Sequence, residues 1–163
     1  MNSIELMNEL EKRGLKAEEI FPGEIKVFLN KENFINHLSY LRGVGFCNLP
    51  FMSGVDYIND NEFEVVYHVY SYEDKIHVLA KVRIPRDNPE IGTVTGLWEQ
   101  AQFYEQEIHE FFGIYFQGNN DLTHLFLENF LDIPPLRKDF DTREYSIKAF
   151  GANIQGESVG GCK

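Results

Sequence analysis

The chain has 163 residues, a mass of 19.0 kDa and a net charge of −11 from 26 acidic and 15 basic residues. This length fits one domain, and the negative charge argues against direct binding to nucleic acid or anionic lipid, which attract basic proteins. The sequence has no apolar run of about 18 residues and no apolar signal-peptide core, so we expect any membrane association to depend on a partner.

The N-terminal segment predicts a helix followed by a strand. Residues 2–13 show helical apolar spacing, with a capping box formed by Asn2 and Glu5 and a stop at Gly14. Residues 24–29 alternate between apolar and other side chains, which indicates a strand.

A second helix and a short strand come next. We expect Asn30 to cap the helix and glycines 43 and 45 to end it; its apolar residues recur at helical spacing, namely Phe34, Leu38 and Leu41. Residues 46–51 read as a short apolar strand, limited by Pro50, which cannot donate to a sheet. A polar turn at 59–61 follows.

Two further strands form the strongest β signal. Residues 63–70 and 76–84 flank a turn, and each places apolar side chains on one face, namely Phe63, Val65, Tyr67, Val69, Ile76, Val78, Ala80, Val82 and Ile84. This pattern predicts a β-hairpin with one core face. His68 and His77 are expected to face each other on the opposite side, where two imidazoles would supply only half of a metal site.

A long helix is predicted near 94–112, with Thr93 or Thr95 as its cap and Gly113 as its stop. Its apolar face holds Val94, Leu97, Ala101, Tyr104, Ile108 and Phe111. Its other side holds Glu99, Gln102, Gln106 and Glu110.

Three polar residues of this helix allow two interpretations. Glu105 and His109 are four residues apart, so with Glu107 they could hold a metal or carry out acid–base chemistry. Alternatively they form an acidic stripe that faces solvent or a partner. We favour the stripe, because no second ligand pair follows at a recognisable spacing.

The predicted order of elements is α-β-α-β-β-β-α. This order indicates the α+β class, with a mostly antiparallel sheet, helices packed on one face, and the other face or an edge left for a partner. We expect residues 1–132 to form this domain.

Residues 133–163 are expected to form an extended C-terminal arm and a flexible tail. Two prolines stiffen its start, and Leu136 and Phe140 are apolar anchors on either side of a charged cluster. No periodicity is visible from residue 141 on. The alternatives are a disordered end and an arm over 133–150 that wraps a neighbour; we favour the arm, because apolar anchors would serve no purpose in a disordered end.

Motifs for cofactors are absent from the sequence. The two cysteines, Cys47 and Cys162, are far apart, whereas iron–sulfur and structural zinc sites need clustered thiols. No phosphate-binding glycine loop or GxSxG nucleophile motif occurs. We expect two free thiols in a reducing cytoplasm.

An ordered set of short motifs covers about residues 40–142. It includes FEVVYH from Phe63, VRIP from Val82, EQEIHEFFGI from Glu105 and PLRKDF from Pro135. The chain resembles the thirty-kilodalton-subunit family of respiratory complex I, which includes homologues in energy-converting membrane-bound NiFe hydrogenases. Two features depart from the family pattern: Gln106 replaces an arginine, and the loop 118–124 lacks the usual basic residues.

The resemblance implies a non-catalytic subunit without its own cofactor or metal, in the peripheral arm on the cytoplasmic side of an ion-translocating membrane complex. Its partners would be a hydrogenase-like large subunit, with the NiFe centre or quinone site, and an Fe–S small subunit. The partner interface is expected to include Glu105, Glu107, His109, Pro135, Leu136, Arg137, Lys138, Asp139 and Phe140.

The run from Glu107 to Glu110 is more similar to relatives in membrane-bound hydrogenases and formate hydrogenlyases, so we favour an energy-converting hydrogenase or a related ferredoxin-linked complex. The alternatives are the thirty-kilodalton subunit of an NADH:quinone oxidoreductase, a stand-alone acidic adaptor, and a free-standing metal-dependent enzyme that uses Glu105, Glu107 and His109, with His124 as a further ligand.

Overall fold

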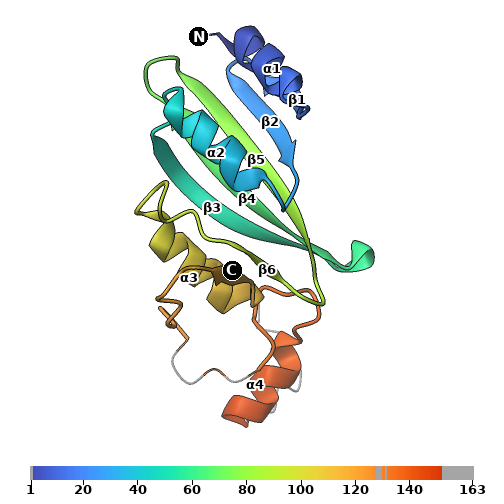
Figure 1. Ribbon diagram of the computed structural model, residues 1–163. Helices are drawn as coiled ribbons and strands as arrows, with labels where there is room; N and C mark the ends of the chain where they lie inside the picture. Colours follow the sequence, from blue (N-terminus) through green and yellow to red (C-terminus); the bar gives the residue numbers. More distant parts are fainter. Residues whose placement is uncertain (1, 128–129, 131, 152–163) are drawn as a thin grey trace, which may run out of the picture.

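The computed structural model of this chain describes residues 2–127, 130 and 132–151 (Figure 1). The α+β class is confirmed. The described elements are α1 (Ser3–Lys12), β1 (Lys16–Phe21), β2 (Glu24–Leu29), α2 (Phe34–Gly43), β3 (Asn48–Tyr57), a 3-10 turn (Ile58–Asp60), β4 (Glu62–Ser71), β5 (Ile76–Pro85), β6 (Glu90–Gly92), α3 (Ala101–Phe112), β7 (Tyr115–Gln117) and α4 (Thr142–Phe150).

The central sheet has five strands in the order β1-β2-β5-β4-β3. Only the β2–β5 pair is parallel, and the other three pairs are antiparallel, as the sequence predicts. The hairpin of β4 and β5 pairs all ten residues of each strand, and β5 is the middle strand of the sheet. A separate parallel pair, β6 and β7, leads into and out of α3.

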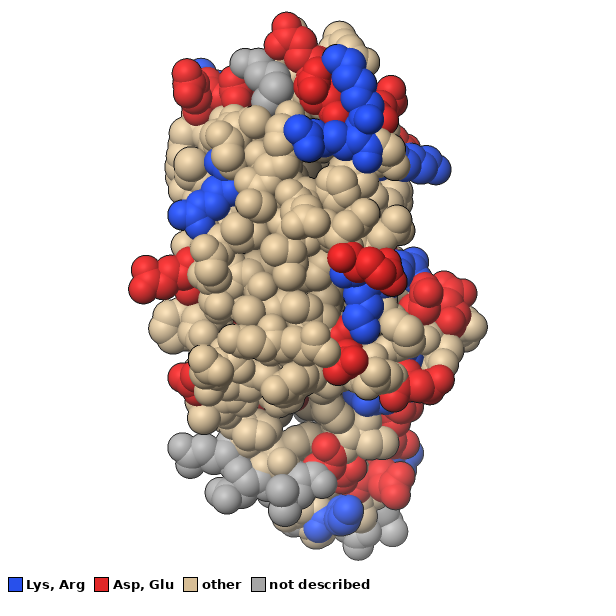
Figure 2. Space-filling view, viewed as in Figure 1, with Lys and Arg blue, Asp and Glu red and all other residues tan. Residues whose placement is uncertain are grey.

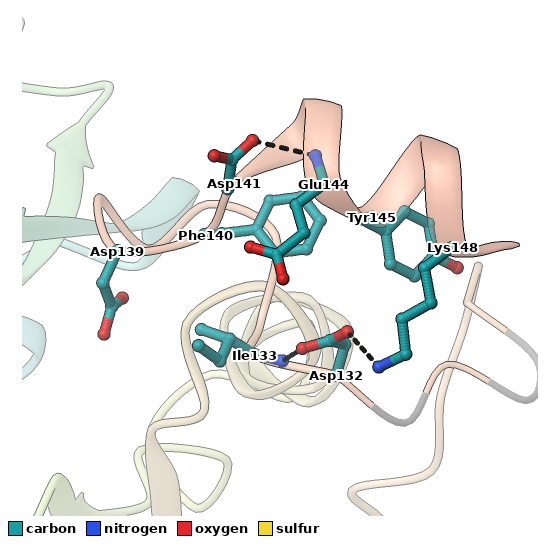
Figure 3. A pocket seen from close by; sticks show the side chains of 8 residues that line it. All are labelled: Asp132, Ile133, Asp139, Phe140, Asp141, Glu144, Tyr145 and Lys148. Atoms are coloured by element: carbon teal, nitrogen blue, oxygen red, sulfur yellow. Dashed lines mark hydrogen bonds and ion pairs between the residues drawn. The ribbon is translucent and has the colours of Figure 1, made fainter. Parts of the chain in front are cut away.

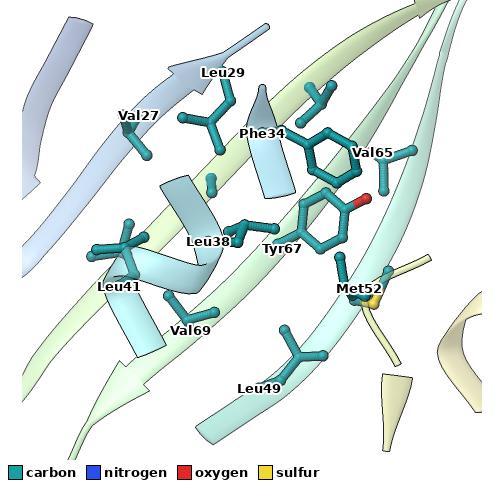
Figure 4. Close-up of a cluster of buried hydrophobic side chains, with 14 of the residues drawn as sticks. Val27, Leu29, Phe34, Leu38, Leu41, Leu49, Met52, Val65, Tyr67 and Val69 are labelled. Carbon is teal, nitrogen blue, oxygen red and sulfur yellow. The ribbon is translucent and has the colours of Figure 1, made fainter. Parts of the chain in front are cut away.

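The core fills one face of this sheet. Tyr67, at the centre of β4, is fully buried, and the ring of Phe34 from α2 stacks on it at 5.8 Å between centroids (Figure 4). Leu38 and Val27 lie in the same cluster, so α2 closes the core over β2, β5 and β4. The five expected inward residues of β5 are all buried, which confirms the predicted hairpin face.

α3 covers the β3 side of the same face. Gly54 of β3 allows this approach, because a Cβ atom there would lie 2.8 Å from the ring of Phe112. At the edge of β3, the Tyr104 hydroxyl donates to the Pro50 carbonyl oxygen at 2.6 Å, so this one acceptor is not free to pair with another strand.

Local signals near the N-terminus are confirmed. The Asn2 side chain accepts from the Glu5 N–H at 2.9 Å, and the Glu5 carboxylate accepts from the Asn2 N–H at 3.0 Å. This is the expected capping box, and Gly14 follows the helix with a φ of +77°.

Three features of the first half of the chain differ from the predictions. Strand β1 was not predicted, because this edge strand is exposed along most of its length and shows no alternation. α2 begins at Phe34, and Asn30 contributes its backbone carbonyl instead of a side-chain cap. β3 is ten residues long, because a bulge between Asn48 and Phe51 accommodates the proline.

The long helix is shorter than predicted. α3 starts at Ala101 and has no side-chain cap, and turns at residues 95–97 and 99–100 precede it. Neither Thr93 nor Thr95 caps it, because the Thr93 hydroxyl donates instead to a carboxylate within the helix.

The C-terminal segment differs from the expected irregular end. Residues Thr142–Phe150 form α4, and the Asp141 side chain caps it by accepting from the N–H groups of Arg143 and Glu144. The pattern was too weakly amphipathic to reveal this helix from sequence. The predicted flexible tail from residue 152 on, with Cys162, lies outside the described residues.

Candidate partner-binding site

Glu105, expected on an acidic stripe, is fully buried instead. Its carboxylate accepts from the Val94 N–H at 2.8 Å, the Thr93 hydroxyl at 2.7 Å and the Asn119 side-chain amide at 2.8 Å. Burial raises the pKa of Glu105, although these three hydrogen bonds oppose the shift. Glu105 therefore joins α3 to the segments that follow β6 and β7, at the same end of this parallel pair, and does not reach solvent.

The other two residues of that stripe are separate from Glu105. Glu107 is exposed, and His109 is half-buried with its Nδ1 atom 2.9 Å from the Ile114 carbonyl oxygen. The helix thus does not bring the three side chains together. Among the described residues, no group of three or more His, Cys, Asp or Glu side chains could hold a metal ion.

Gln106 and Glu110, expected on the solvent side of α3, are each only 3% exposed. This prediction is wrong because the loop after β7 covers that side of the helix. The Gln106 amide lies 3.3 Å from the Thr123 hydroxyl, so two positions that depart from the family pattern contact each other.

Glu110 receives three consecutive backbone N–H groups from this loop. They come from Leu125, Phe126 and Leu127 at 2.5–3.3 Å, and the His124 ring lies at 3.3 Å. Burial alone would raise the pKa of Glu110, but these hydrogen bonds outweigh it and lower the pKa. One carboxylate of α3 therefore binds the backbone of residues 125–127 in this loop.

The segment 134–140 lies on the body of the protein. The Leu136 N–H donates to the Phe111 carbonyl oxygen at 3.0 Å, and the Lys138 N–H donates to the buried Asp56 carboxylate at 2.8 Å. Arg86 pairs with Asp56 and also with Asp139, the latter at 2.6 Å. The charged cluster that was expected to contact a neighbour is thus partly used within the chain.

The two expected anchors differ in exposure. Leu136 is 55% exposed, whereas Phe140 packs against Phe130 and Tyr145 within the chain. Between this segment and α4 lies a pocket of about 190 Å³ (Figure 3). Its lining residues are Asp132, Ile133, Asp139, Phe140, Asp141, Glu144, Tyr145 and Lys148.

Exposed apolar side chains gather at this end of the molecule, a feature that the sequence of the loop did not indicate. Phe126 is 67% exposed and Leu125 38%, and the Phe126 ring stacks on Phe111 at 6.1 Å between centroids. The Phe111 carbonyl oxygen in turn accepts a hydrogen bond from the Leu136 N–H, so the loop and the segment 134–140 are adjacent. Large exposed apolar patches mark protein interaction sites.

Figure 2 shows the helix-bearing side of the molecule. Charged side chains are few over its middle, where α2 and α3 lie, and gather at the two ends and along the margins. This distribution stands out in a chain with a net charge of −11. Depletion of charge is typical of the centre of protein–protein interfaces.

On the opposite face of the sheet, His68 and His77 contact each other as predicted. Their Nε2 and Nδ1 atoms are 2.8 Å apart, and the Phe51 and Tyr70 rings pack against the pair. Burial and the neighbouring His77 lower the pKa of His68, while Glu24 acts in the opposite direction.

The lowered pKa of His68 predicts acid destabilisation. The unfolded chain takes up a proton near pH 6.5, before the folded protein does, so the free energy of unfolding should fall as the pH drops below about 6.5. Denaturant unfolding of the wild type and of His68→Gln between pH 5 and 8 checks this, and the variant should show a shallower slope. Because the pKa of His37 is also lowered, His37→Gln should reduce the slope as well, and it measures the part of the slope that does not come from His68. Equal slopes for the wild type and His68→Gln would contradict the expectation.

Comparisons with known proteins agree with the fold and the motifs. Residues 27–146 match the family described as the 30 Kd subunit of respiratory-chain NADH dehydrogenase. The C subunit of the F(420)H(2) dehydrogenase of Methanosarcina mazei is 38% identical over 122 residues, which cover 74% of this chain and 77% of the relative. The NADH-quinone oxidoreductase subunit 5 of Thermus thermophilus is 31% identical over 149 residues, which cover 85% of this chain and 72% of the relative.

Two solved structures share the fold. A chain of the membrane-bound sulfane sulfur reductase, an archaeal respiratory membrane complex, aligns with a TM-score of 0.82 and 27% identity over 94% of both chains. A trypsin-resistant fragment of Nqo5 aligns with a TM-score of 0.66 and 30% identity over 75% of this chain and 100% of the fragment.

These relatives are subunits of multi-subunit respiratory complexes, and none of the helices in the described part of this chain is long and apolar enough to cross a membrane. A family match over residues 27–146 and several relatives above 30% identity agree with the motifs in the α3 region and in the segment 134–140. The chain belongs to the family of the 30-kilodalton subunit of respiratory-chain NADH dehydrogenase, and is a subunit related to those of complex I.

Proposed function

We propose that this chain is a non-catalytic assembly subunit in the peripheral arm, on the cytoplasmic side, of an ion-translocating membrane oxidoreductase related to complex I. It holds no cofactor of its own, and its partners are a large subunit with a NiFe centre or quinone site and an Fe–S small subunit. Membrane contact is made through these partners.

The observation that carries this proposal is the state of the segment 134–140. Backbone hydrogen bonds to Phe111 and Asp56 fix its path, while Leu136 remains 55% exposed. Fixing the backbone in advance lowers the entropy that association costs, so an exposed apolar side chain on such a segment is suited to docking. The charge-poor surface over α2 and α3 supports the same role.

Among related complexes, we favour an energy-converting hydrogenase or a ferredoxin-linked complex. The sequence from Glu107 to Glu110 supports this choice, as does the contact between Gln106 and Thr123, where the family pattern has basic residues. The alignment with the sulfane sulfur reductase chain over 94% of both chains also supports a parent complex outside the NADH dehydrogenases. The alternative, the corresponding subunit of an NADH:quinone oxidoreductase, is supported by the relatives from such enzymes.

Purification of the native complex through an affinity tag on this chain tests the proposal. Mass spectrometry should identify a large subunit and an Fe–S subunit at equal stoichiometry with the chain. A NiFe-centre signature in the large subunit separates an energy-converting hydrogenase from the NADH-linked alternative. Recovery of the chain alone, from cells that make such subunits, would contradict an assembly role.

Truncation after Asp132 should abolish assembly while the remaining domain still melts cooperatively. The truncation removes Leu136, the hydrogen bond that the Lys138 N–H donates to Asp56, and the ion pair of Asp139 with Arg86. The Asp56–Arg86 pair remains within the domain. Co-purification and calorimetry measure the two effects, and truncation after Gly151 is the matched control, which should assemble. If the chain truncated after Asp132 fails to fold, the segment belongs to the core and the predicted division into domain and arm is wrong.

A further inference from the structure

Glu110 is a buried carboxylate that binds the loop whose exposed apolar side chains lie beside the segment 134–140. Its side chain is 1% exposed, yet no lysine or arginine pairs with it among the described residues. It is stabilised instead by the N–H groups of Leu125, Phe126 and Leu127. Consecutive N–H groups that converge on one anion form a nest, which fixes the backbone that supplies them.

The loop that supplies these groups has little other support. Residues 121–127 contain no helix or strand. Upstream, the Gln102 side chain donates to the Asp121 carbonyl oxygen, and Gln106 contacts Thr123. Within residues 124–127, the backbone hydrogen bonds that reach α3 all end at Glu110. The direction in which Leu125 and Phe126 point therefore depends on this carboxylate.

The two side chains that Glu110 orients are apolar and exposed. Phe126 is 67% exposed and Leu125 38%, and the only ring that an aromatic contact places against Phe126 in the described part of the chain is Phe111. Because the carboxylate below them is buried and bound by N–H groups, it presents no open negative charge to a partner. This arrangement suits an apolar recess on the other molecule.

The position of this pair points to the same partner that the proposed function gives to the segment 134–140. Phe111 contacts Phe126 through its ring and Leu136 through its carbonyl oxygen, so the pair is continuous with the surface of the segment 134–140. A partner that covers Leu136 would meet Phe126 in the same contact. In the proposed function that partner is the large subunit.

We propose that Glu110 is a positioning residue that holds Leu125 and Phe126 in place as an apolar contact for an apolar recess of the large partner subunit. This inference rests on the proposed function. Substitution of Glu110 should displace Leu125 and Phe126 although Glu110 itself does not contact the partner. Substitution of Phe126 should remove the contacting side chain itself.

The test uses the full chain and its purified large partner subunit. Phe126→Ser should weaken the association by at least about tenfold, which is the size of effect expected when an anchor at an interface is removed. Glu110→Gln, which turns one acceptor oxygen into a donor that faces the loop N–H groups, should also weaken association and should speed amide hydrogen exchange at residues 125–127. Tyr72→Ser is the matched control, since Tyr72 is 70% exposed in the β4–β5 turn.

The outcomes separate the inference from the proposed function. If the wild type does not bind the large subunit, the proposed function fails. If the wild type binds and both Phe126→Ser and Glu110→Gln bind equally well, the apolar contact is wrong. If only Phe126→Ser weakens binding while Glu110→Gln leaves both binding and exchange unchanged, the positioning role is wrong. Self-association of the chain that Phe126→Ser abolishes would assign the surface to a second copy and would overturn the choice of partner.

Discussion

Glu105→Ala is expected to lower the free energy of unfolding by about 2–4 kcal/mol. The substitution leaves the Val94 N–H and the Asn119 amide as buried donors without their acceptor, and each such group costs about 1–3 kcal/mol. Relief of the buried carboxylate offsets a part of this loss, because burial raises the pKa of Glu105 and so opposes its charged form. Denaturant unfolding at pH 7 measures the effect.

The pH dependence provides a second check on Glu105. Because its pKa in the folded protein lies above the usual 4.5, the folded protein binds this proton more tightly than the unfolded chain. The wild type therefore gains stability from this group as the pH falls toward 4.5, and the difference from Glu105→Ala should widen. Glu107→Ala, on the exposed side of the same helix, is the control. If Glu105→Ala lowers the free energy of unfolding no more than Glu107→Ala does, the hydrogen bonds of Glu105 do not support the fold.

Ile108→Ala is expected to cost about 2–5 kcal/mol, which is typical of removing a buried aliphatic side chain and leaving a cavity. Ile108 is 3% exposed and belongs to the core cluster between α3 and the sheet. The milder Ile108→Val should cost about 0.5–1.5 kcal/mol. Thermal and denaturant melts of the purified chain measure both.

Phe103→Ala is the matched control for Ile108, because it removes a larger side chain from the same helix at a position that is 65% exposed. Phe103→Ala should change the free energy of unfolding of the isolated chain by close to zero. A cost near zero for Ile108→Ala as well would mean that α3 does not pack on the sheet through this position.

The sequence by itself determined the elements whose signals are local. The hairpin of β4 and β5 was predictable because alternation of apolar side chains fixes which face is buried. α1 was predictable because Asn2 and Glu5 satisfy helix N–H groups within one turn. The family was also accessible, because its motifs are contiguous runs of residues.

Other elements had no local signal. β1 lies at an exposed edge, so its side chains need not alternate. The two three-residue strands β6 and β7 are far apart in sequence and exist only because α3 brings them together. α4 is weakly amphipathic, and its clearest local sign was the capping position of Asp141.

For the candidate site, the tertiary structure decided which polar residues of α3 are buried. The sequence places Glu105 four residues after Ala101 and three before Ile108, on the same helical stripe, and this spacing could have indicated its burial. Gln106 and Glu110 carry no such sign, since their burial depends on a loop that folds over the other side of the helix. Helical periodicity in the sequence indicates only the face of α3 that packs on the sheet. The burial of its other side depends on hydrogen bonds between the helix and a loop about 15 residues further along the chain, and only folding brings these residues together.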